Sequence, residues 1–582
     1  MESTSLNRAS RLAALSAMSD DEGLDVLVVG GGVTGAGIAL DAATRGLRTG
    51  IVEMQDWAQG TSSRSSKLVH GGLRYLYNLD FALVHEALRE RGLLLARTAP
   101  HLVKAQPFLW PLKMPVIERS YSAVGVGLYD VMARAGAKGH PVPPQRHYTK
   151  AGALAVFPDI KPEQLTGAIR YFDARVDDAR LVLGLVRTAV GYGAYAASRT
   201  QVVDFTRNER GRVTGALVRD LETGAEHTIR ASRIINATGV WTEQSEQLAL
   251  DGDASDGSLK VLASKGIHLI FDKDRIKGDT GLFLRTEKSV LFIIPWQRYW
   301  IVGTTDTAWH QARQHPVATT ADIDYVLEHA NEVLASNLTR DDIIGTYAGL
   351  RPLLQPTAKD GGDGDTKSTK VSREHTVAEV APGLSVIAGG KLTTYRAMAE
   401  DAVDFALGPQ MAAGLPSVTA QTPLVGAAGL EAACRLFANQ AREFGWDEDR
   451  VEHLLGRYGT EVSVLLELIA DHPEWAEPIP SAPAYLKVEA AFAVLHEGAL
   501  HLEDILNHRI RLSYETRDRG VSALADLSAI VAPLLGWDEQ EVRREQDSYR
   551  AVAAAEDAAE EEQTDAAAES IRLQAPDLVP LV

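Results

Sequence analysis

The feature that most constrains the fold of this chain is a glycine-rich turn between a short apolar run and an Ala-rich helical stretch. Residues 25–29 are rich in valine, as in a buried parallel strand, and Gly30-x-Gly32-x-x-Gly35 follows directly. At such a junction the glycines permit a tight turn, a close approach of the backbone to a ligand, and close packing of helix on strand. The free N–H groups at the start of the helix bind anions. The pattern therefore predicts a βαβ unit that binds the pyrophosphate of a dinucleotide.

Two further features bear on which dinucleotide is bound. Glu53 ends the predicted second strand, where its carboxylate can accept hydrogen bonds from a ribose diol. Much later, a buried strand at residues 384–388 ends in Gly389-Gly390 and passes into a helical pattern over residues 393–407. A helix N-terminus placed there suits a flavin, whose ring edge becomes anionic on reduction. The sequence therefore favours FAD over NAD.

Composition excludes several classes of protein. The net charge of −19 argues against a general nucleic-acid binder, because an acidic chain repels phosphate backbones. Cys434 is the only cysteine, which excludes an internal disulfide, a cysteine zinc site and a flavin–disulfide reductase; we expect a small buried helical residue there. The acidic loop at residues 359–365 lacks the glutamate of a calcium loop, so no metal is expected.

The ends of the chain bear on its location and order. Residues 1–23 lack the pattern of a signal peptide, and no run of apolar residues is long enough to span a membrane. We therefore expect a cytoplasmic protein and leave peripheral membrane contact open. After Pro423 the pattern is helical, which predicts a separate helical domain over residues 420–550. The segment 551–582 is rich in Ala and Glu, and we predict a disordered acidic tail.

Seven motifs in a fixed order make the chain similar to one known family, the bacterial aerobic FAD-dependent glycerol-3-phosphate dehydrogenases. The resemblance covers about residues 20–410, with a weaker helical match to about residue 520. The motifs are Gly30-Gly31-Gly32-Val33-Thr34-Gly35-Ala36-Gly37, the loop 61–75, Val176-Asp177-Asp178-Ala179-Arg180-Leu181, Asn236-Ala237-Thr238-Gly239, Gly303-Thr304-Thr305-Asp306, Gly349-Leu350-Arg351-Pro352-Leu353 and Gly389-Gly390-Lys391-Leu392-Thr393-Thr394-Tyr395-Arg396.

The resemblance implies an α/β fold of glutathione-reductase type. Its FAD-binding domain, within residues 21–410, is assembled from discontinuous segments. An antiparallel-sheet cap (substrate) domain, at about residues 76–170 and 246–345, lies over the flavin, and an all-helical C-terminal domain follows. Residues 1–20 are expected to form an N-terminal extension, because the family motifs begin only after them.

The resemblance also implies the site residues. Those expected to bind FAD are Gly30, Gly32, Val33, Thr34, Gly35, Glu53, Thr61, Ser62, Ser63, Ser65, Ser66, Lys67, Leu68, His70, Gly71, Gly72, Val202, Ala237, Thr238, Gly239, Thr305, Gly390, Lys391, Leu392, Thr393 and Thr394. Those expected to bind the substrate are Arg74, Tyr75, His268, Arg351, Arg373 and Lys391. His268, Arg351 and Lys391 are the expected catalytic residues.

The chemistry of these residues agrees with an alcohol that carries a phosphate. Guanidinium groups match phosphate oxygens bidentately, and oxidation of a secondary alcohol needs a hydride acceptor and a base. His268 could take the hydroxyl proton, whereas Arg351 and Lys391 could stabilise the developing alkoxide. The expected reaction is oxidation of sn-glycerol 3-phosphate to dihydroxyacetone phosphate, with electrons passed to a quinone.

Alternatives stay open at this point. An oxidase of the same family would pass electrons to oxygen, and an amine or amino-acid oxidase shares the two glycine motifs. A flavin-binding regulatory protein without turnover would leave the cations without a purpose. The mixed apolar and basic stretch 104–134 suits either a membrane interface or the core of the cap domain. A homodimer is compatible with the sequence, which does not set the oligomeric state.

Overall fold

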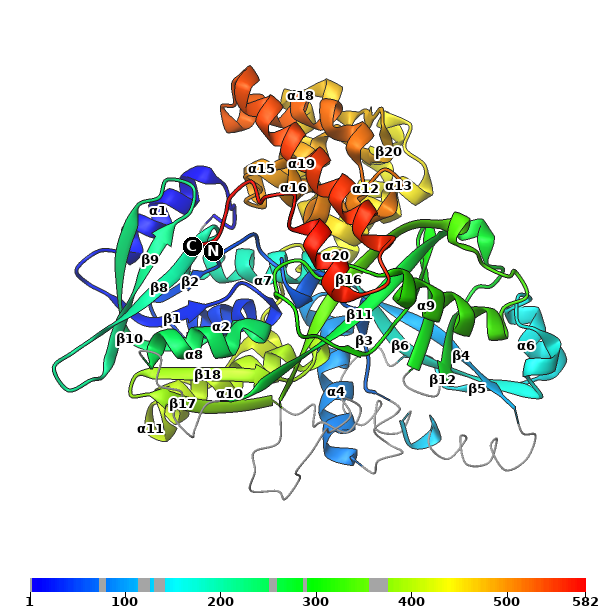
Figure 1. Ribbon diagram of the computed structural model, residues 1–582, viewed down its shortest axis with the longest axis horizontal. Helices are drawn as coiled ribbons and strands as arrows, with labels where there is room; N and C mark the ends of the chain where they lie inside the picture. Colours follow the sequence, from blue (N-terminus) through cyan, green and yellow to red (C-terminus); the bar gives the residue numbers. More distant parts are fainter. Residues whose placement is uncertain are drawn as a thin grey trace.

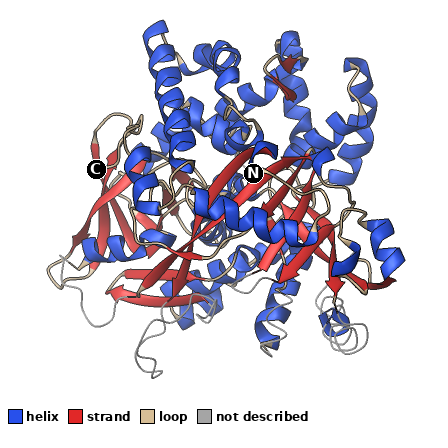
Figure 2. Ribbon diagram, turned by 45° about the vertical axis from the view of Figure 1, so that its right-hand side comes forward, coloured by secondary structure: helices blue, strands red, loops and turns tan. Residues whose placement is uncertain are grey.

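The computed structural model describes residues 3–72, 80–113, 126–129, 142–250, 259–285, 290–354 and 375–582. Two large sheets lie below a group of helices formed by the C-terminal part of the chain (Figures 1 and 2). Within the described residues, no helix combines the length and apolar character needed to cross a membrane.

The first sheet contains the predicted βαβ unit. Its central strands β18, β10, β1, β2 and β7 are parallel, and β17 adds to the edge in antiparallel orientation. The strands come from distant segments: β1 Leu24–Val29, β2 Thr49–Val52, β7 Tyr195–Ala197, β8 Thr200–Arg207, β9 Val213–Asp220, β10 Glu226–Asn236, β17 His375–Ala381 and β18 Leu384–Gly389. The predicted assembly from discontinuous segments is therefore present.

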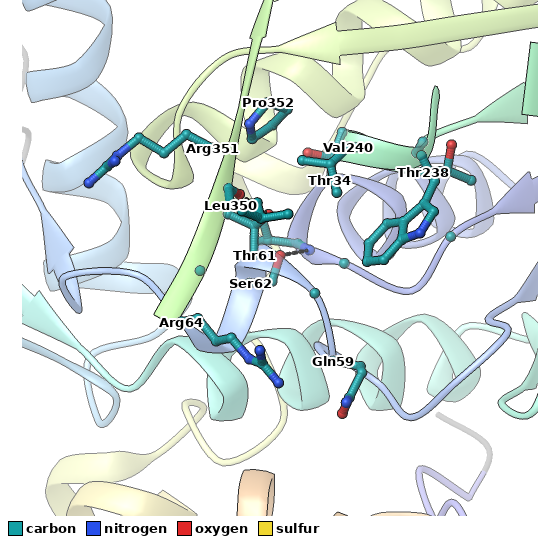
Figure 3. Close-up of a pocket in the computed structure, with 18 of the residues that line it drawn as sticks. Thr34, Gln59, Thr61, Ser62, Arg64, Thr238, Val240, Leu350, Arg351 and Pro352 are labelled. Carbon is teal, nitrogen blue, oxygen red and sulfur yellow. Dashed lines mark hydrogen bonds between the residues drawn. The ribbon is translucent and has the colours of Figure 1, made fainter. Parts of the chain in front are cut away.

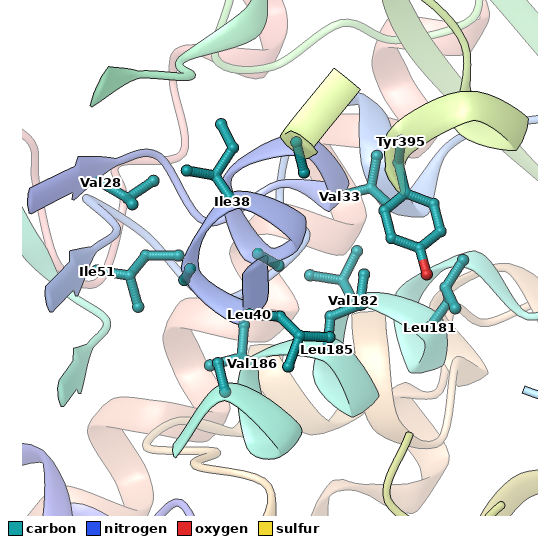
Figure 4. Packing of buried hydrophobic residues seen from close by; sticks show 14 of the residues in the cluster. Val28, Val33, Ile38, Leu40, Ile51, Leu181, Val182, Leu185, Val186 and Tyr395 are labelled. Atoms are coloured by element: carbon teal, nitrogen blue, oxygen red, sulfur yellow. The ribbon is translucent and has the colours of Figure 1, made fainter. Parts of the chain in front are cut away.

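Helices pack on this sheet through apolar side chains. The helices are α2 Val33–Thr44, α7 Asp178–Gly191 and α10 Tyr395–Leu407, with α1 Arg8–Met18 and α8 Thr242–Ala249 nearby. Ile38 of α2 is fully buried together with Val28 and Ile51 of the sheet and Val182 of α7 (Figure 4). At about 25 cal/mol per Å² of apolar surface, this burial is the main force that holds the helices on the sheet.

The second sheet is mostly antiparallel and contains ten strands. Its strands are β3 Leu68–Val69, β4 Val103–Leu112, β5 Arg146–Thr149, β6 Gly167–Val176, β11 Val261–Asp272, β12 Gly281–Arg285, β13 Val290–Trp296, β14 Tyr299–Gly303, β15 Thr307–Ala308 and β16 Ile343–Leu354. The helices α4 Phe81–Leu93, α6 Lys150–Val156 and α9 Thr320–Val333 accompany it. This sheet is the antiparallel layer expected of the cap domain.

The apolar residues proposed for membrane contact belong to the core of this sheet wherever the structure describes them. Phe108, Leu109, Trp110 and Leu112 lie on β4, and each is at most 4% exposed. Strand β4 is paired with β6 on one side and β12 on the other, so its apolar side chains pack between neighbours. For these residues the membrane interpretation is wrong. Residues 114–125 and 130–134 of the stretch lie outside the described residues.

The C-terminal domain, formed by α12 to α20, is helical but not entirely so. Its helices are α12 Leu430–Gln440, α13 Glu448–Tyr458, α14 Val462–Asp471, α15 Lys487–His496, α16 Leu502–Asp504, α17 Leu512–Glu515, α18 Leu524–Leu535, α19 Glu539–Glu560 and α20 Asp565–Arg572. A small hairpin of β19 Pro478–Ile479 and β20 Ala482–Leu486 corrects the all-helical prediction. Cys434 lies on α12 but is half-buried, so its predicted full burial is wrong.

The prediction of a disordered acidic tail is also wrong. Helix α19 continues to Glu560, and α20 follows it back over the second sheet (Figure 1). The carboxylates of the tail pair with cations from outside the tail. Arg519 pairs with Glu556 at 3.0 Å, with Asp557 at 2.6 Å and with Glu560. Asp565 pairs with Lys265 of β11. Counting the charge within the tail alone misses these partners, because they are distant in sequence.

Arg519 offers a test of how the tail is held. Its side chain is 7% exposed, and Arg519→Met would remove the cation that three neighbouring acids share, although Glu556 keeps Arg572 at 3.6 Å. We expect a loss of about 2–4 kcal/mol in the free energy of unfolding of the tail, somewhat below the cost of breaking a fully buried pair. Limited proteolysis and denaturant titration would measure it. The matched control is Arg435→Met, because the Arg435–Glu431 pair is exposed and should contribute less than about 1 kcal/mol. Equal proteolysis of both variants would contradict the prediction.

Candidate active site

A cavity of about 390 Å³ is lined by residues from both sheets. The ends of β1, β2, β10 and β18 contribute from the first sheet, and β11, β13 and β16 contribute from the second. In Figure 3, Thr34 and Thr238 lie on one side of this space, and Leu350, Arg351 and Pro352 lie along the strand opposite. Ligands of open α/β sheets bind at such carboxyl ends of parallel strands.

The glycine turn has the geometry that its pattern predicts. Gly30 has φ +111°, which side-chain-bearing residues rarely adopt, and a Cβ on Gly35 would lie 1.9 Å from the Gly30 carbonyl oxygen. Gly32 caps α2 without a side-chain hydrogen bond, and a Cβ there would come within 3.1 Å of Ser62 Oγ. The Val33 N–H donates to Ser62 Oγ at 2.9 Å, and the start of α2 faces the cavity, where an anion can bind.

Glu53 lies at the end of β2, beside this turn. Its carboxylate accepts hydrogen bonds from the backbone N–H of Gly31, at 2.5 Å, and of Gln55, at 2.8 Å. Burial raises the pKa of this carboxyl, and the two N–H donors act in the opposite direction. Glu53 lines the cavity, at the position expected for a ribose contact.

A second turn faces the cavity from β18. Gly389 and Gly390 have φ +81° and +82°, and a Cβ on Gly390 would lie 2.4 Å from Met398 Sδ. The 3₁₀ turn Leu392–Thr394 and helix α10 follow at once. A helix start near the cavity is the feature that favoured a flavin from the sequence.

The predicted FAD contacts divide into residues that line the cavity and residues that do not. Most of the predicted FAD contacts line it: Gly30, Gly32, Val33, Thr34, Glu53, Thr61, Ser62, Ser65, Ser66, Leu68, His70, Val202, Ala237, Thr238, Gly239, Gly390, Lys391 and Leu392. The predicted contacts that the structure does not bring to the cavity wall are Gly35, Ser63, Lys67, Gly71, Gly72, Thr305, Thr393 and Thr394.

Lys67 is the clearest case of a predicted contact with another partner. Its ammonium group is fully buried and donates to Asp178 Oδ1 at 2.6 Å and to the Ser63 carbonyl at 3.1 Å. Thr393 instead ties the loop to the 3₁₀ turn before α10, because its hydroxyl accepts from the His70 N–H at 3.0 Å. These two residues hold the wall of the cavity in place.

His268 lies on β11 and is 2% exposed. Its Nε2 is 2.8 Å from Ser66 Oγ, and its ring stacks on Tyr347 with 4.7 Å between centroids. Burial first, and then the positive charges of Arg351 and Lys67, hold the pKa of His268 well below its usual range. The imidazole is therefore neutral near pH 7, which is the form able to accept a proton.

Arg351 approaches from β16, next to β11. Its Nη2 donates to Thr304 Oγ1 at 2.9 Å, and its Nη1 is 3.7 Å from Asp306 Oδ1. A Cβ on Gly266 would lie 2.3 Å from this guanidinium, so the glycine leaves it room. Among the described residues that line the cavity, Arg64, Arg351 and Lys391 are cations and Glu53 is a carboxylate. The wall is thus locally positive in an acidic protein.

Three predicted substrate residues, Arg74, Tyr75 and Arg373, lie outside the described residues. The sequence analysis missed Trp241 and Phe292, which line the cavity. Trp241 is two residues beyond Asn236-Ala237-Thr238-Gly239, so extending that motif could have found it. Its indole Nε1 is buried without a hydrogen-bond partner among the described residues.

Comparison with known families agrees with the two-part organisation. The model of the FAD-dependent oxidoreductase family matches residues 25–396. The model of the C-terminal domain of alpha-glycerophosphate oxidase matches residues 417–542. The first match contains both sheets and the glycine turn, and the second contains most of the C-terminal domain.

Individual relatives match over nearly the whole chain. Glycerol-3-phosphate dehydrogenase 2 of Mycobacterium tuberculosis is 50% identical over 96% of this chain and 92% of its own length. The human mitochondrial glycerol-3-phosphate dehydrogenase is 33% identical over 93% of this chain and 74% of its length. The structure of glycerol-3-phosphate dehydrogenase from Bacillus halodurans, complexed with FAD, has a TM-score of 0.72 and 29% identity, covering 100% of both chains. The chain therefore belongs to the family of FAD-dependent glycerol-3-phosphate dehydrogenases.

Proposed function

We propose that this protein oxidises sn-glycerol 3-phosphate to dihydroxyacetone phosphate with bound FAD. The observation that carries the proposal is the arrangement of the cavity, which brings together the helix start at the glycine turn and the neutral His268 beside Arg351. The residues fit FAD, because a Cβ at Gly32 would crowd Ser62 where the pyrophosphate is expected, and Glu53 stands where a ribose is expected. When bound, FAD accepts a hydride at N5.

The protein's own residues would bind and orient the substrate. His268 would accept the proton of the secondary hydroxyl as the C–H bond of the same carbon is broken. Arg351 and Lys391 would stabilise the negative charge that develops on the oxygen. Arg373, with Arg74 and Tyr75, would hold the phosphate. In this scheme the substrate loses a hydride to the flavin and a proton to the imidazole, so charge and electrons balance.

We propose a quinone as the electron acceptor, with peripheral contact at the cytoplasmic face of a membrane. The names of the similar proteins, dehydrogenases rather than oxidases, support this acceptor. The C-terminal family model is named for an oxidase, which favours oxygen as the second candidate. Structural neighbours among amino-acid deaminases, at 13–15% identity, share the fold alone and favour no amine substrate.

The acceptor can be determined directly. Protein reduced anaerobically with glycerol 3-phosphate should be reoxidised faster by a soluble quinone than by oxygen-saturated buffer, without stoichiometric hydrogen peroxide. Reoxidation by oxygen that forms one peroxide per flavin would replace the quinone with oxygen in this proposal. Flotation with anionic liposomes at low salt would test membrane contact independently, and failure to float would contradict it.

Gly32→Val tests the position of the pyrophosphate. The new side chain would occupy the space between the start of α2 and Ser62, so the purified protein should be colourless. Absorbance near the flavin bands measures the occupancy. A matched control is Gly46→Val: Gly46 also lies at an end of α2, but a Cβ there meets nothing within 4 Å. Because Gly46 has φ +81°, that variant reports the effect of backbone strain without a blocked site. Full flavin in Gly32→Val would place the cofactor elsewhere.

Steady-state kinetics with an artificial dye acceptor test the roles of the cations and of His268. Arg373→Ala should raise KM by about ten- to a hundredfold with kcat nearly unchanged, since a charge-assisted contact contributes roughly 1.5–3 kcal/mol. Arg351→Ala should raise KM similarly and also lower kcat, because Arg351 lies beside His268. His268→Ala should lower kcat by about 10²- to 10⁴-fold. Unchanged kinetics in the arginine variants would refute the assignments.

Plain glycerol and pH provide controls for the same experiment. Glycerol lacks the phosphate, so it should be a poor substrate that loses little more when Arg373 is replaced. Because the pKa of His268 lies well below 6.5, kcat/KM should not fall near pH 6.5 on account of this residue. A fall centred there that disappears in His268→Ala would contradict the neutral, buried state of the ring.

A further inference from the structure

The ring of His268 stacks on Tyr347, and Tyr347 contacts a second aromatic ring, that of Tyr514. His268 on β11 lies directly opposite Tyr347 on β16, and their rings are nearly parallel, at 17°. Tyr347 also contacts Tyr514, with 5.1 Å between the ring centroids and a tilt of 48° between the rings. Tyr514 belongs to α17 of the C-terminal domain. A continuous series of rings therefore runs from that domain to His268.

The backbone is shaped to allow this contact. Gly345 lies two residues before Tyr347 on β16, and a Cβ on Gly345 would lie 2.3 Å from the Tyr514 carbonyl oxygen. Any side chain at Gly345 would push α17 away from the strand. The close approach of the two domains at this point thus depends on the glycine.

A buried cation adds to the pair. The ammonium group of Lys67 lies 5.4 Å from the ring centre of Tyr347 and 5.5 Å from that of Tyr514. Such distances are typical of a cation attracted by an aromatic ring. Lys67 is itself fixed by Asp178 at 2.6 Å. Both rings are thereby held against the loop that carries Ser66.

The contribution of Tyr514 comes from its ring rather than from its hydroxyl. The hydroxyl is buried and has no hydrogen-bond partner among the described residues. By contrast, the hydroxyl of Tyr347 donates to the Ser65 carbonyl at 2.9 Å, next to the residue that contacts His268 Nε2. The imidazole is thus fixed at Nε2 by Ser66 and on its face by Tyr347, and Tyr347 in turn contacts Tyr514.

We propose that Tyr514 of the C-terminal domain is a positioning residue that fixes the orientation of His268 through Tyr347. This inference rests on the proposed function, in which His268 accepts the substrate proton. It gives the C-terminal domain a part in the chemistry, although none of its residues lines the main cavity within the described chain. Proton transfer depends steeply on geometry, so a small rotation of the ring is enough to slow it.

The test uses three variants of the FAD-loaded protein. Tyr514→Leu should lower kcat roughly tenfold and leave KM and flavin content unchanged, since a displacement of about 1 Å can cost about a hundredfold. Tyr514→Phe keeps the ring and should resemble the parent protein. Tyr549→Leu is the matched control, because Tyr549 is equally buried in the same domain, at 6% exposure, but bonds to the Arg519 carbonyl instead.

Two further measurements separate positioning from a general loss of structure. In the His268→Ala background, Tyr514→Leu should have no additional effect on kcat, since the residue it positions is gone. Hydrogen–deuterium exchange at the imidazole Cε1, followed by mass spectrometry, should be faster at His268 in Tyr514→Leu and unchanged at His453. If Tyr514→Leu does not fold, Gly345→Ala is the second variant. Its new methyl group would push the Tyr514 backbone away from β16, so it should show the same fall in kcat.

Several results would overturn the inference. A parent-like kcat in Tyr514→Leu would do so, as would an equal loss in the His268→Ala background or in Tyr549→Leu. If glycerol 3-phosphate does not reduce the flavin of the parent protein, the proposed function fails. The exchange rate at His268 still decides the positioning in that case, because it needs no substrate.

Discussion

Two neighbouring carboxylates at the start of α7 hold the site together. Asp178 is fully buried and accepts hydrogen bonds from Lys67 Nζ, from the Ser65 hydroxyl at 2.7 Å and from the Ala179 N–H. Asp177 accepts from the Arg180 N–H and pairs with Arg511 of the C-terminal domain at 2.7 Å. One residue thus fixes the cavity loop and the other fixes the domain that supports it. Removing one member of such a buried pair typically costs about 3–5 kcal/mol, because the other charge is left without a partner.

Asp177 stays charged because the C-terminal domain supplies cations. Burial alone would raise the pKa of Asp177, but Arg511 and Arg457 hold it at about 2. A carboxyl whose pKa is lowered by folding stabilises the folded state above its unfolded pKa of about 3.9, and this contribution is lost as the pH falls toward 2. The pKa of His501 shifts in the opposite direction, and so does its effect on stability as the pH changes. Burial would lower its pKa, but hydrogen bonds to Glu222 and Glu545 raise it to about 10. Its contribution is complete below about pH 6.5 and is lost as the pH rises toward 10.

Local sequence patterns predicted much of this structure, whereas contacts between segments distant in the sequence could not be predicted from them. The glycine turn, Glu53 and the Gly389-Gly390 turn are set by backbone constraints over a few residues, so their positions could be read from the sequence. The burial of β4 depends on β6 and β12, and the order of the tail depends on Arg519 and Lys265. The family resemblance places Lys67 among the FAD contacts, yet its ammonium group donates to Asp178 instead. Neither the hydrophobic pattern nor the charge count of a segment reports such partners.

The difference between a charge count over the sequence and the charges that lie near one site in space explains how a protein with a net charge of −19 can present a site for an anion. At physiological ionic strength, exposed charges are screened over about 8 Å, so most surface carboxylates contribute little inside the cavity. The nearby groups decide the local potential. Arg351 and Lys391 lie in the cavity wall, and Lys67 lies behind it within range to depress the pKa of His268. Lys67 is paired with Asp178 at 2.6 Å, so its charge is partly compensated. The ion pair of Arg351 with Asp306 is longer, at 3.7 Å, and Arg351 lines the cavity. A dianionic phosphate entering here would offset the positive field around His268, which makes proton uptake by the imidazole easier when substrate is present than when it is absent.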